Sequence, residues 1–264
     1  MMRYSLVPVL IMSRRGLTMH WTWMAVVMAF AWLAVGAAAP SSYSVATTRQ
    51  ARGALLAGDE EAWKGATAVT WGPAPYETTF RALWRGEGLF LRFDASDDRP
   101  WHTMTRRDDR LWEDEVVEIF IDPDRSGRDY AELEISPANV VCDLRLILPW
   151  PDMKQDFAWD IEGLETRVVP RPGARAGAGD WTATALLPWA AFRSLPSASS
   201  IAVPPRPGDR WRFNLFRIKR PGGPADPGRD AVFAAWSSPG KGSFHVPEAF
   251  RDLVFEAPAP SPAR

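Results

Sequence analysis

Cysteine is almost absent from this sequence of 264 residues, since Cys142 is the only one. A single thiol cannot form an internal disulfide, so the hydrophobic core has to stabilise the fold, which this chain length permits. Long amphipathic helices are missing too, because no twelve-residue segment repeats its apolar positions with the helical period. Tyrosine occurs 4 times against 14 tryptophans, and so many indole rings suggest a role beyond packing.

An excess of basic residues is missing as well. Of the 31 basic residues, Arg3, Arg14 and Arg15 lie in residues 1–39, which leaves 28 basic against 32 acidic residues and a net charge of −4. This charge has the wrong sign for a nucleic-acid ligand, and no basic stripe compensates for it. We therefore expect no nucleic-acid partner.

Residues 1–39 contain no acidic residue and have the pattern of an export signal. An arginine-containing start leads into an apolar run from Trp21 to Leu33 and then into Gly36-Ala37-Ala38-Ala39. This order is typical of a secretory signal peptide, and the alternative is an uncleaved N-terminal anchor, because the run is nearly long enough to span a bilayer. We expect an exported protein that is periplasmic, extracellular or tethered to a membrane at the cell envelope.

The rest of the chain is predicted to form one domain. Residues 40–58 are interpreted as a linker, or as a loose edge strand over Ser41–Gly58, with the folded domain beginning after about Ala46. Residues 59–257 form the domain, and residues 258–264 form a flexible tail rich in proline and alanine.

Short strand patterns follow one another through the domain. They cover Tyr76–Trp84, Leu89–Asp94, Val116–Asp122, Tyr130–Ile135, Val140–Leu148, Leu164–Val169, Trp181–Leu187, Trp211–Lys219 and Leu253–Glu256. Glycine- and aspartate-rich turns separate several of them, and Pro188–Phe192 is expected to form one helical turn. Regularly spaced strands with turn residues between them predict an all-β fold, an antiparallel β-sandwich.

The strand Val116–Asp122 contains a charged residue at its centre. In an extended strand Val117, Ile119 and Ile121 point to one face, and Glu118 points to the other face. A carboxylate at this position indicates either a solvated sheet face or a binding site.

The segment around this strand resembles a known family. Trp112–Asp124 is similar to the signature of family 9 carbohydrate-binding modules and of related DOMON-like β-sandwiches (jelly-roll folds). Further similar segments follow the same order along the chain: Gly88–Phe93 with Ser96-Asp97-Asp98, Tyr130–Pro137, Gly179–Ala183 with Leu187-Pro188-Trp189, Gly208–Asn214, Ala235–Ser237 and Phe244–Phe250. The resemblance extends from about Trp63 to Glu256.

The resemblance implies a non-catalytic protein that holds a glycan sugar between two aromatic side chains. These aromatic positions fall on Trp112 and on Phe244, where a relative carries tryptophan. Glu118 falls on an acid of the sugar site, Glu134 replaces a basic residue, and Lys241 completes the predicted carbohydrate-binding set. The residue types fit this chemistry, because rings stack on the C–H faces of sugars and carboxylates orient hydroxyl groups.

The resemblance also bears on partners and cofactors. Relatives are often attached to glycoside hydrolases, and this chain has no room for a catalytic domain. We therefore expect it to support polysaccharide breakdown, and hence carbohydrate catabolism, by separate glycoside hydrolases, with an N-terminal membrane tether as an option. No cofactor is expected to be required, although the resemblance admits a structural calcium ion.

Other readings of these residues lead to different functions. Asp122, Asp124, Ser126 and Asp129 resemble the start of a calcium loop, but Leu133 stands where that loop needs glutamate, so a hairpin turn is favoured. Glu113, Asp114, Glu115 and Glu118 lie too close on one strand to face each other across a glycosidase cleft. His102, Met104 and His245 are the residues that a haem-binding DOMON-like domain would use. A structural envelope sandwich without a ligand is the remaining alternative.

The tryptophans fall into two groups, those in or beside predicted strands and those in predicted loops. Those in strands or beside them are expected in the core: Trp63, Trp84, Trp181, Trp189 and Trp211. Trp101, Trp150 and Trp159 lie in predicted loops, where they are candidates to flank a glycan.

Overall fold

The computed structural model describes residues 40–171 and 179–258, so the predicted export signal and most of the predicted tail lie outside the described residues. The strands are β1 (Ser42–Thr47), β2 (Ala68–Trp71), β3 (Thr78–Arg85), β4 (Gly88–Ala95), β5 (Val116–Asp122), β6 (Tyr130–Ile135), β7 (Val141–Leu148), β8 (Lys154–Asp156), β9 (Glu165–Pro170), β10 (Trp181–Pro188), β11 (Arg210–Lys219), β12 (Val232–Ala235) and β13 (Arg251–Phe255). The predicted all-β sandwich is confirmed, and each of the nine predicted strands is present with ends within two residues.

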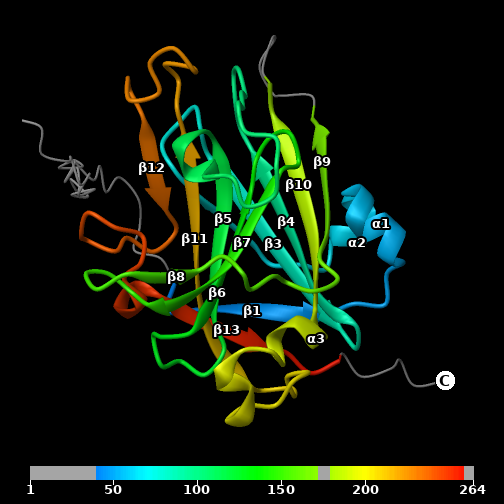
Figure 1. Ribbon diagram of the computed structural model, residues 1–264. Coiled ribbons are helices and arrows are strands. Elements are labelled where there is room, and N and C mark those ends of the chain that lie inside the picture. The colour runs from blue at the N-terminus through cyan, green and yellow to red at the C-terminus, as the bar shows by residue number, and fades with distance from the viewer. Residues whose placement is uncertain (1–39, 172–178, 259–264) are drawn as a thin grey trace, which may run out of the picture.

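The strands form two layers (Figure 1). The first layer has the order β8-β7-β6-β5-β11-β13, with β12 paired to β11. The second has the order β3-β4-β10-β9, with β2 paired to β3. β1 joins the layers, because it pairs with β13 on one side and with β3 on the other. Both of its pairings are parallel, and the other strand pairs of the described residues are antiparallel.

The interpretation of residues 40–58 as a linker or edge strand is wrong. β1 has a neighbour on each side, and Tyr43 and Val45 are buried in the core. The Tyr43 hydroxyl donates to the carbonyl oxygen of Thr67 over 2.6 Å and accepts from the amide of Ala82 over 2.8 Å. The folded domain therefore begins at β1.

Short helices complete the fold. α1 (Arg52–Ala57) and α2 (Glu60–Trp63) cover the outer face of the second layer near β9 and β10 (Figure 1). α3 (Trp189–Phe192) is the predicted helical turn, and the 3₁₀ turns are η1 (Leu111–Glu113), η2 (Pro196–Ser199) and η3 (Pro247–Ala249). None of the described helices is long and apolar enough to cross a membrane.

The main core lies between the two layers. Val117, Ile119 and Ile121 of β5 point into it, as their alternation predicted. Val116 and Phe120 point the other way, into a second apolar cluster on the outer face of the first layer. The five predicted core tryptophans are all buried, four of them in the main core and Trp63 beneath the helices.

The hairpin between β5 and β6 is built from the aspartates that resemble a calcium loop. Asp122 Oδ2 accepts from the amide of Gly127 over 2.9 Å, and Asp124 Oδ1 accepts from the amide of Ser126 over 3.0 Å. These bonds form the predicted turn. A calcium ion at this turn stays a prediction.

We expect Asp122 to make the protein less stable as the pH rises. Burial and the neighbouring Asp124 raise the pKa of Asp122 from 3.8 to about 7. The folded state then keeps a proton that the unfolded chain loses, so this contribution is complete below about pH 4 and is lost as the pH approaches 7. A difference of about 3 pKa units corresponds to about 4 kcal/mol.

Urea unfolding between pH 4 and pH 7, in the presence of a chelator, measures this effect. Asp122→Asn should reduce the dependence on pH, whereas a control substitution of the exposed Asp152 by asparagine should keep it. An Asp122→Asn variant whose stability falls as steeply as that of the wild type would contradict the prediction.

Candidate functional site

The outer face of the first layer carries a row of side chains that cross the strands side by side. Cys142 of β7 lies opposite Glu134 of β6, which lies opposite Glu118 of β5, which in turn lies opposite Phe216 of β11. Glu132 lies on the same face of β6, two residues from Glu134. The sheet register thus brings three glutamates together, and the predicted site residues Glu118 and Glu134 are direct neighbours.

These three glutamates, called the acidic triad below, are buried. Glu118, Glu132 and Glu134 are only 2%, 3% and 1% exposed. One carboxylate oxygen from each lies within 4.8 Å of those of the other two. The idea of a solvated sheet face at Glu118 is therefore wrong, because the second apolar cluster and its covering loops exclude water from it.

Burial changes the protonation of the acidic triad. It raises the pKa of Glu132 to about 8 and the pKa of Glu118 and Glu134 well above the ordinary value. The charge of Glu132 adds to the rise at Glu118, while Arg220 opposes it. Burial and mutual proximity therefore favour the protonated form of these carboxyl groups.

Arg220 anchors the segment that carries Trp112 and was missed by the sequence analysis. Its Nε donates to the carbonyl oxygen of Asp114 over 2.9 Å, and its Nη2 donates to that of Trp112 over 2.8 Å. Its guanidinium group also lies 5.2 Å from the ring centre of Phe233. Nothing in the local sequence separates Arg220 from other arginines that follow a strand.

The two predicted aromatic residues of the site lie against the same apolar cluster. Trp112 is half-buried, and its ring centre is 6.2 Å from that of Phe157 and 5.5 Å from the guanidinium group of Arg110. Phe244 stacks on Phe216, with ring centres 4.2 Å apart and an angle of 21°. The structure therefore places both predicted rings on the face that contains the acidic triad.

Exposed apolar side chains extend this surface. Trp150, Met153 and Phe157 are 44%, 45% and 39% exposed, and all three come from residues 149–160. The predicted site residue Lys241 is exposed, and its Nζ lies 5.7 Å from the ring centre of Trp150. Trp150 was predicted only as one of three loop tryptophans that are candidates to flank a glycan, and Phe157 was not predicted, although the aromatic residues of this loop are a usable signal.

Other candidate residues have separate environments. His245 stacks on Phe120 with ring centres 4.8 Å apart, its Nδ1 is 3.2 Å from the Tyr130 hydroxyl, and burial lowers its pKa to about 4. Asp114 accepts hydrogen bonds from Thr103, whereas Glu115 faces a buried lysine. The acids at the start of β5 therefore do not act as one group.

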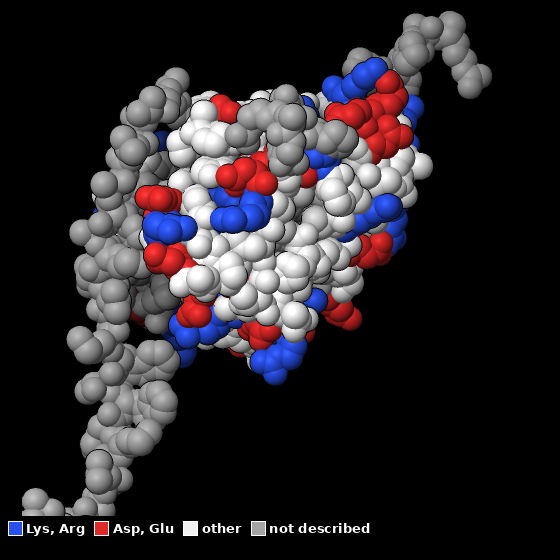
Figure 2. Space-filling view, turned by 90° about the horizontal axis from the view of Figure 1, so that it is seen from above, with Lys and Arg blue, Asp and Glu red and all other residues white. Residues whose placement is uncertain are grey.

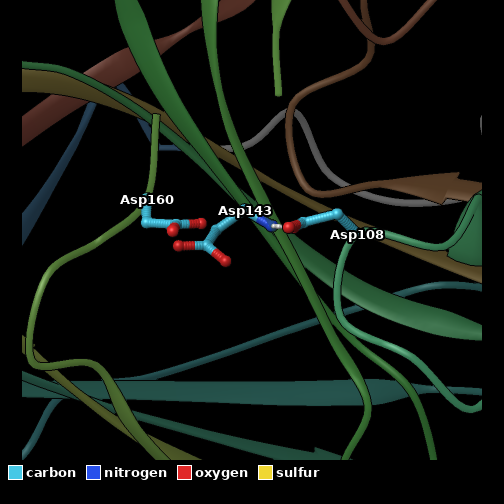
Figure 3. A group of neighbouring side chains, drawn as sticks. All are labelled: Asp108, Asp143 and Asp160. Atoms are coloured by element: carbon cyan, nitrogen blue, oxygen red, sulfur yellow. Dashed lines mark hydrogen bonds between the residues drawn. The ribbon is translucent and has the colours of Figure 1, made fainter. Parts of the chain in front are cut away.

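A second acidic cluster contains Asp108, Asp143 and Asp160. In Figure 3, Asp143 lies between the other two. Arg107 is their counter-charge, because its Nη2 is 2.6 Å from Asp143 and its Nε is 3.1 Å from Asp160. The amide of Ile161 also donates to Asp143 over 2.6 Å. Arg107 therefore offsets part of the negative charge of this cluster, and the acidic triad has no comparable counter-charge among the described residues.

Seen from above, the molecule carries basic and acidic side chains interspersed around a wide area of other residues (Figure 2). The coloured atoms of this face form no basic stripe. This view agrees with the expectation from the sequence that no basic stripe is present.

The fold and the site define a β-sandwich with an acidic and aromatic outer face. Residues 57–138 match the family model described as "Carbohydrate family 9 binding domain-like". The matched range contains Trp112 and the whole acidic triad. The predicted resemblance to family 9 carbohydrate-binding modules is thus confirmed for this part of the chain.

Individual relatives match most of the chain. An "Extracellular protein" of Arthroderma benhamiae is 27% identical over 186 residues, which are 68% of this chain and 78% of the relative. A protein structure from Bacteroides uniformis has a TM-score of 0.59 and 21% identity and covers 82% of this chain and 99% of its own. A family 9 carbohydrate-binding module of Caldicellulosiruptor kristjanssonii, solved with glucose, has a TM-score of 0.58 and 12% identity and covers 84% and 100%.

Proposed function

We propose that this protein is an exported, non-catalytic carbohydrate-binding protein whose site lies on the outer face of the first layer. The observation that carries the proposal is the match of residues 57–138 to a carbohydrate-binding family, over the range that holds Trp112 and the acidic triad. Structures of a family 9 module with glucose and with cellotriose support the ligand class. The extracellular relative supports export, and the acid-free N-terminal sequence agrees with it.

The exposed and half-buried rings are proposed to supply the contact area. Trp112 lies beside Phe157, and Phe244 stacks on Phe216. These ring pairs present flat apolar surfaces, which suit the C–H faces of sugar rings. Lys241 beside Trp150 supplies hydrogen-bond donors for hydroxyl groups.

The glutamates beneath the rings need a movement before they bind sugar. Glu118 and Glu134 are buried, so their carboxylates are reached only when the side chains above them move outwards. Glu134 accepts a hydrogen bond from the backbone of Trp112, which links this movement to the η1 segment. We propose direct contact for Trp112 and Phe244, and contact after opening for Glu118 and Glu134.

The wider role follows from the ligand class. A free or membrane-tethered binder would act beside separate glycoside hydrolases and keep a polysaccharide close to them. Co-purification of such an enzyme with the chain on an insoluble polysaccharide would test this part of the proposal.

We expect Trp112→Ala to weaken glycan binding about tenfold or more. Stacking on a ring contributes about 1 kcal/mol beyond the buried area, and about 1.4 kcal/mol corresponds to one decade of affinity. A glycan array identifies a ligand, and calorimetry with that ligand measures the change. Phe244→Trp should keep or strengthen binding, because it restores the broader ring of relatives.

Trp159→Ala is the matched control. Trp159 packs against the main core, and its indole donates to Ser194 Oγ over 2.7 Å, away from the acidic triad. Its removal should lower stability without changing affinity. An array without any binding glycan would overturn the proposed function, and unchanged affinity in Trp112→Ala would overturn the proposed site.

A further inference from the structure

We propose that Glu118, Glu132 and Glu134 together bind one divalent cation that prefers carboxylate oxygens, such as Ca²⁺, Mg²⁺ or Mn²⁺. The proposal goes beyond carbohydrate binding, since it assigns an ion to the acidic triad whether or not a glycan is present.

The backbone already places the three side chains around one point. Glu118 and Glu134 are paired across β5 and β6, and Glu132 lies on the same face of β6. Their ligand oxygens lie within 4.8 Å of one another. Two oxygens on opposite sides of one calcium ion are about 4.8 Å apart, since each lies about 2.4 Å from it. The spacing therefore fits a shared ion without movement of the strands.

Each of the three glutamates also has one oxygen without a hydrogen-bond donor. Glu118 Oε1, Glu132 Oε2 and Glu134 Oε2 are buried and accept no hydrogen bond from any described residue. A buried carboxylate without a donor is costly, and three on two adjacent strands also repel one another. A cation between them would satisfy the free oxygens and offset the repulsion.

The nearest positive side chain is engaged elsewhere. Arg220 lowers the pKa of Glu118, but it donates to the backbone carbonyl groups of Asp114, Trp112 and Pro227. The contrast with the second acidic cluster is direct, because there Arg107 contacts both Asp143 and Asp160. Among the described residues, the acidic triad is therefore the cluster without a counter-charge of its own.

The exposure of the triad favours an ion over an ammonium group of an amino sugar. Its members are at most 3% exposed, so a sugar reaches them only after the covering rings move. A small ion needs a much narrower path. Glucosamine is therefore included in the test as the competing source of positive charge.

The test uses the full chain, freed of metal with a chelator and then dialysed. CaCl₂, MgCl₂ and MnCl₂ are added separately, and binding is followed by calorimetry and by the melting temperature, with no glycan present. We expect saturable binding of one ion per chain and a rise in melting temperature with at least one of the three salts. Glu132→Gln and Glu134→Gln should each weaken this binding at least about tenfold.

The variants separate binding from folding. Without the ion, Glu134→Gln should melt at the same temperature as the wild type or higher, because a neutral side chain of the same size replaces a buried acid that has an oxygen without a donor. Asp160→Asn, in the second cluster, should keep the wild-type response. The proposal is overturned if no salt binds the wild type, whether or not glucosamine does, or if the response to the salt survives in both Glu132→Gln and Glu134→Gln. Since no glycan is required, this outcome is independent of the test of carbohydrate binding.

Discussion

Asp97→Ala is expected to lower the free energy of unfolding by about 3–5 kcal/mol, because it leaves two buried cations without their closest counter-charge. Asp97 Oδ2 lies 2.7 Å from Arg217 Nη2, and Asp97 Oδ1 lies 2.6 Å from Lys219 Nζ. All three side chains are buried between the layers. Both cations belong to β11 of the first layer, and Asp97 follows β4 of the second, so the contact also holds the layers together.

The remaining acid of this network cannot replace Asp97. Glu115 lies 2.9 Å from Lys219 but 3.9 Å from Arg217, so the loss of Asp97 leaves Arg217 without a close counter-charge. The Asp97 side chain further accepts from the amide of Arg99 over 3.0 Å. Its loss therefore loosens the loop after β4 as well.

Asp98→Ala is the matched control for this prediction. Asp98 is the next residue, its side chain is 53% exposed, and it lies 3.5 Å from Lys219 Nζ. An exposed ion pair contributes at most about 1 kcal/mol. Urea unfolding at neutral pH measures both variants, and equal losses in the two would show that the buried network does not stabilise the protein.

Tyr43→Ala should destabilise the protein by about 3–5 kcal/mol, the usual range when a large buried aromatic side chain is truncated. The ring of Tyr43 contacts both layers, with its centre 5.5 Å from Phe80 of β3 and 5.8 Å from Phe213 of β11. Its hydroxyl group satisfies the buried amide of Ala82. The substitution thus opens a cavity where the two layers meet.

One further variant separates the contribution of the Tyr43 ring from that of its hydroxyl group, and another serves as a control. Tyr43→Phe keeps the ring and should cost about 1–3 kcal/mol, because the Ala82 amide loses its acceptor. Ser44→Ala, on the other face of β1, should change stability very little. Thermal and urea unfolding measure all three variants. A deletion of residues 1–47 that melted like the full chain would show that β1 is dispensable and that residues 40–58 act as a linker after all.

The strands β5 and β6 were predicted with their observed ends, whereas β1 was not recognised as an inner strand. β5 and β6 alternate over six residues or more and enclose a turn rich in aspartate, which are local signals. β1 offers only Tyr43 and Val45 as buried positions, and both of its partners are distant in sequence and parallel. Parallel pairing with distant strands leaves little local pattern to detect.

The candidate site shows the same division. Alternation along β5 and β6 places Glu118 and Glu134 on one face, and it should also have revealed Glu132, which follows the same period. The resemblance placed Trp112 and Phe244 near them, and both do lie on that face. Their role in sugar binding stays a prediction. The aromatic residues of one loop were a usable signal for Phe157, but its contact with Trp112 could not be predicted, because it depends on a loop 45 residues further along the chain.

The sequence by itself determined the strand content, the face of each β5 side chain and the likeness to a carbohydrate-binding family, because these depend on residues close together in the chain. Only the tertiary structure decided that Glu118 is buried and that β1 joins the layers. It also decided that Arg107 contacts the second acidic cluster, whereas one oxygen of each triad glutamate has no hydrogen-bond partner among the described residues. Exposure and charge compensation depend on which distant segments cover a side chain, and the folding of the loops over the sheet sets that coverage.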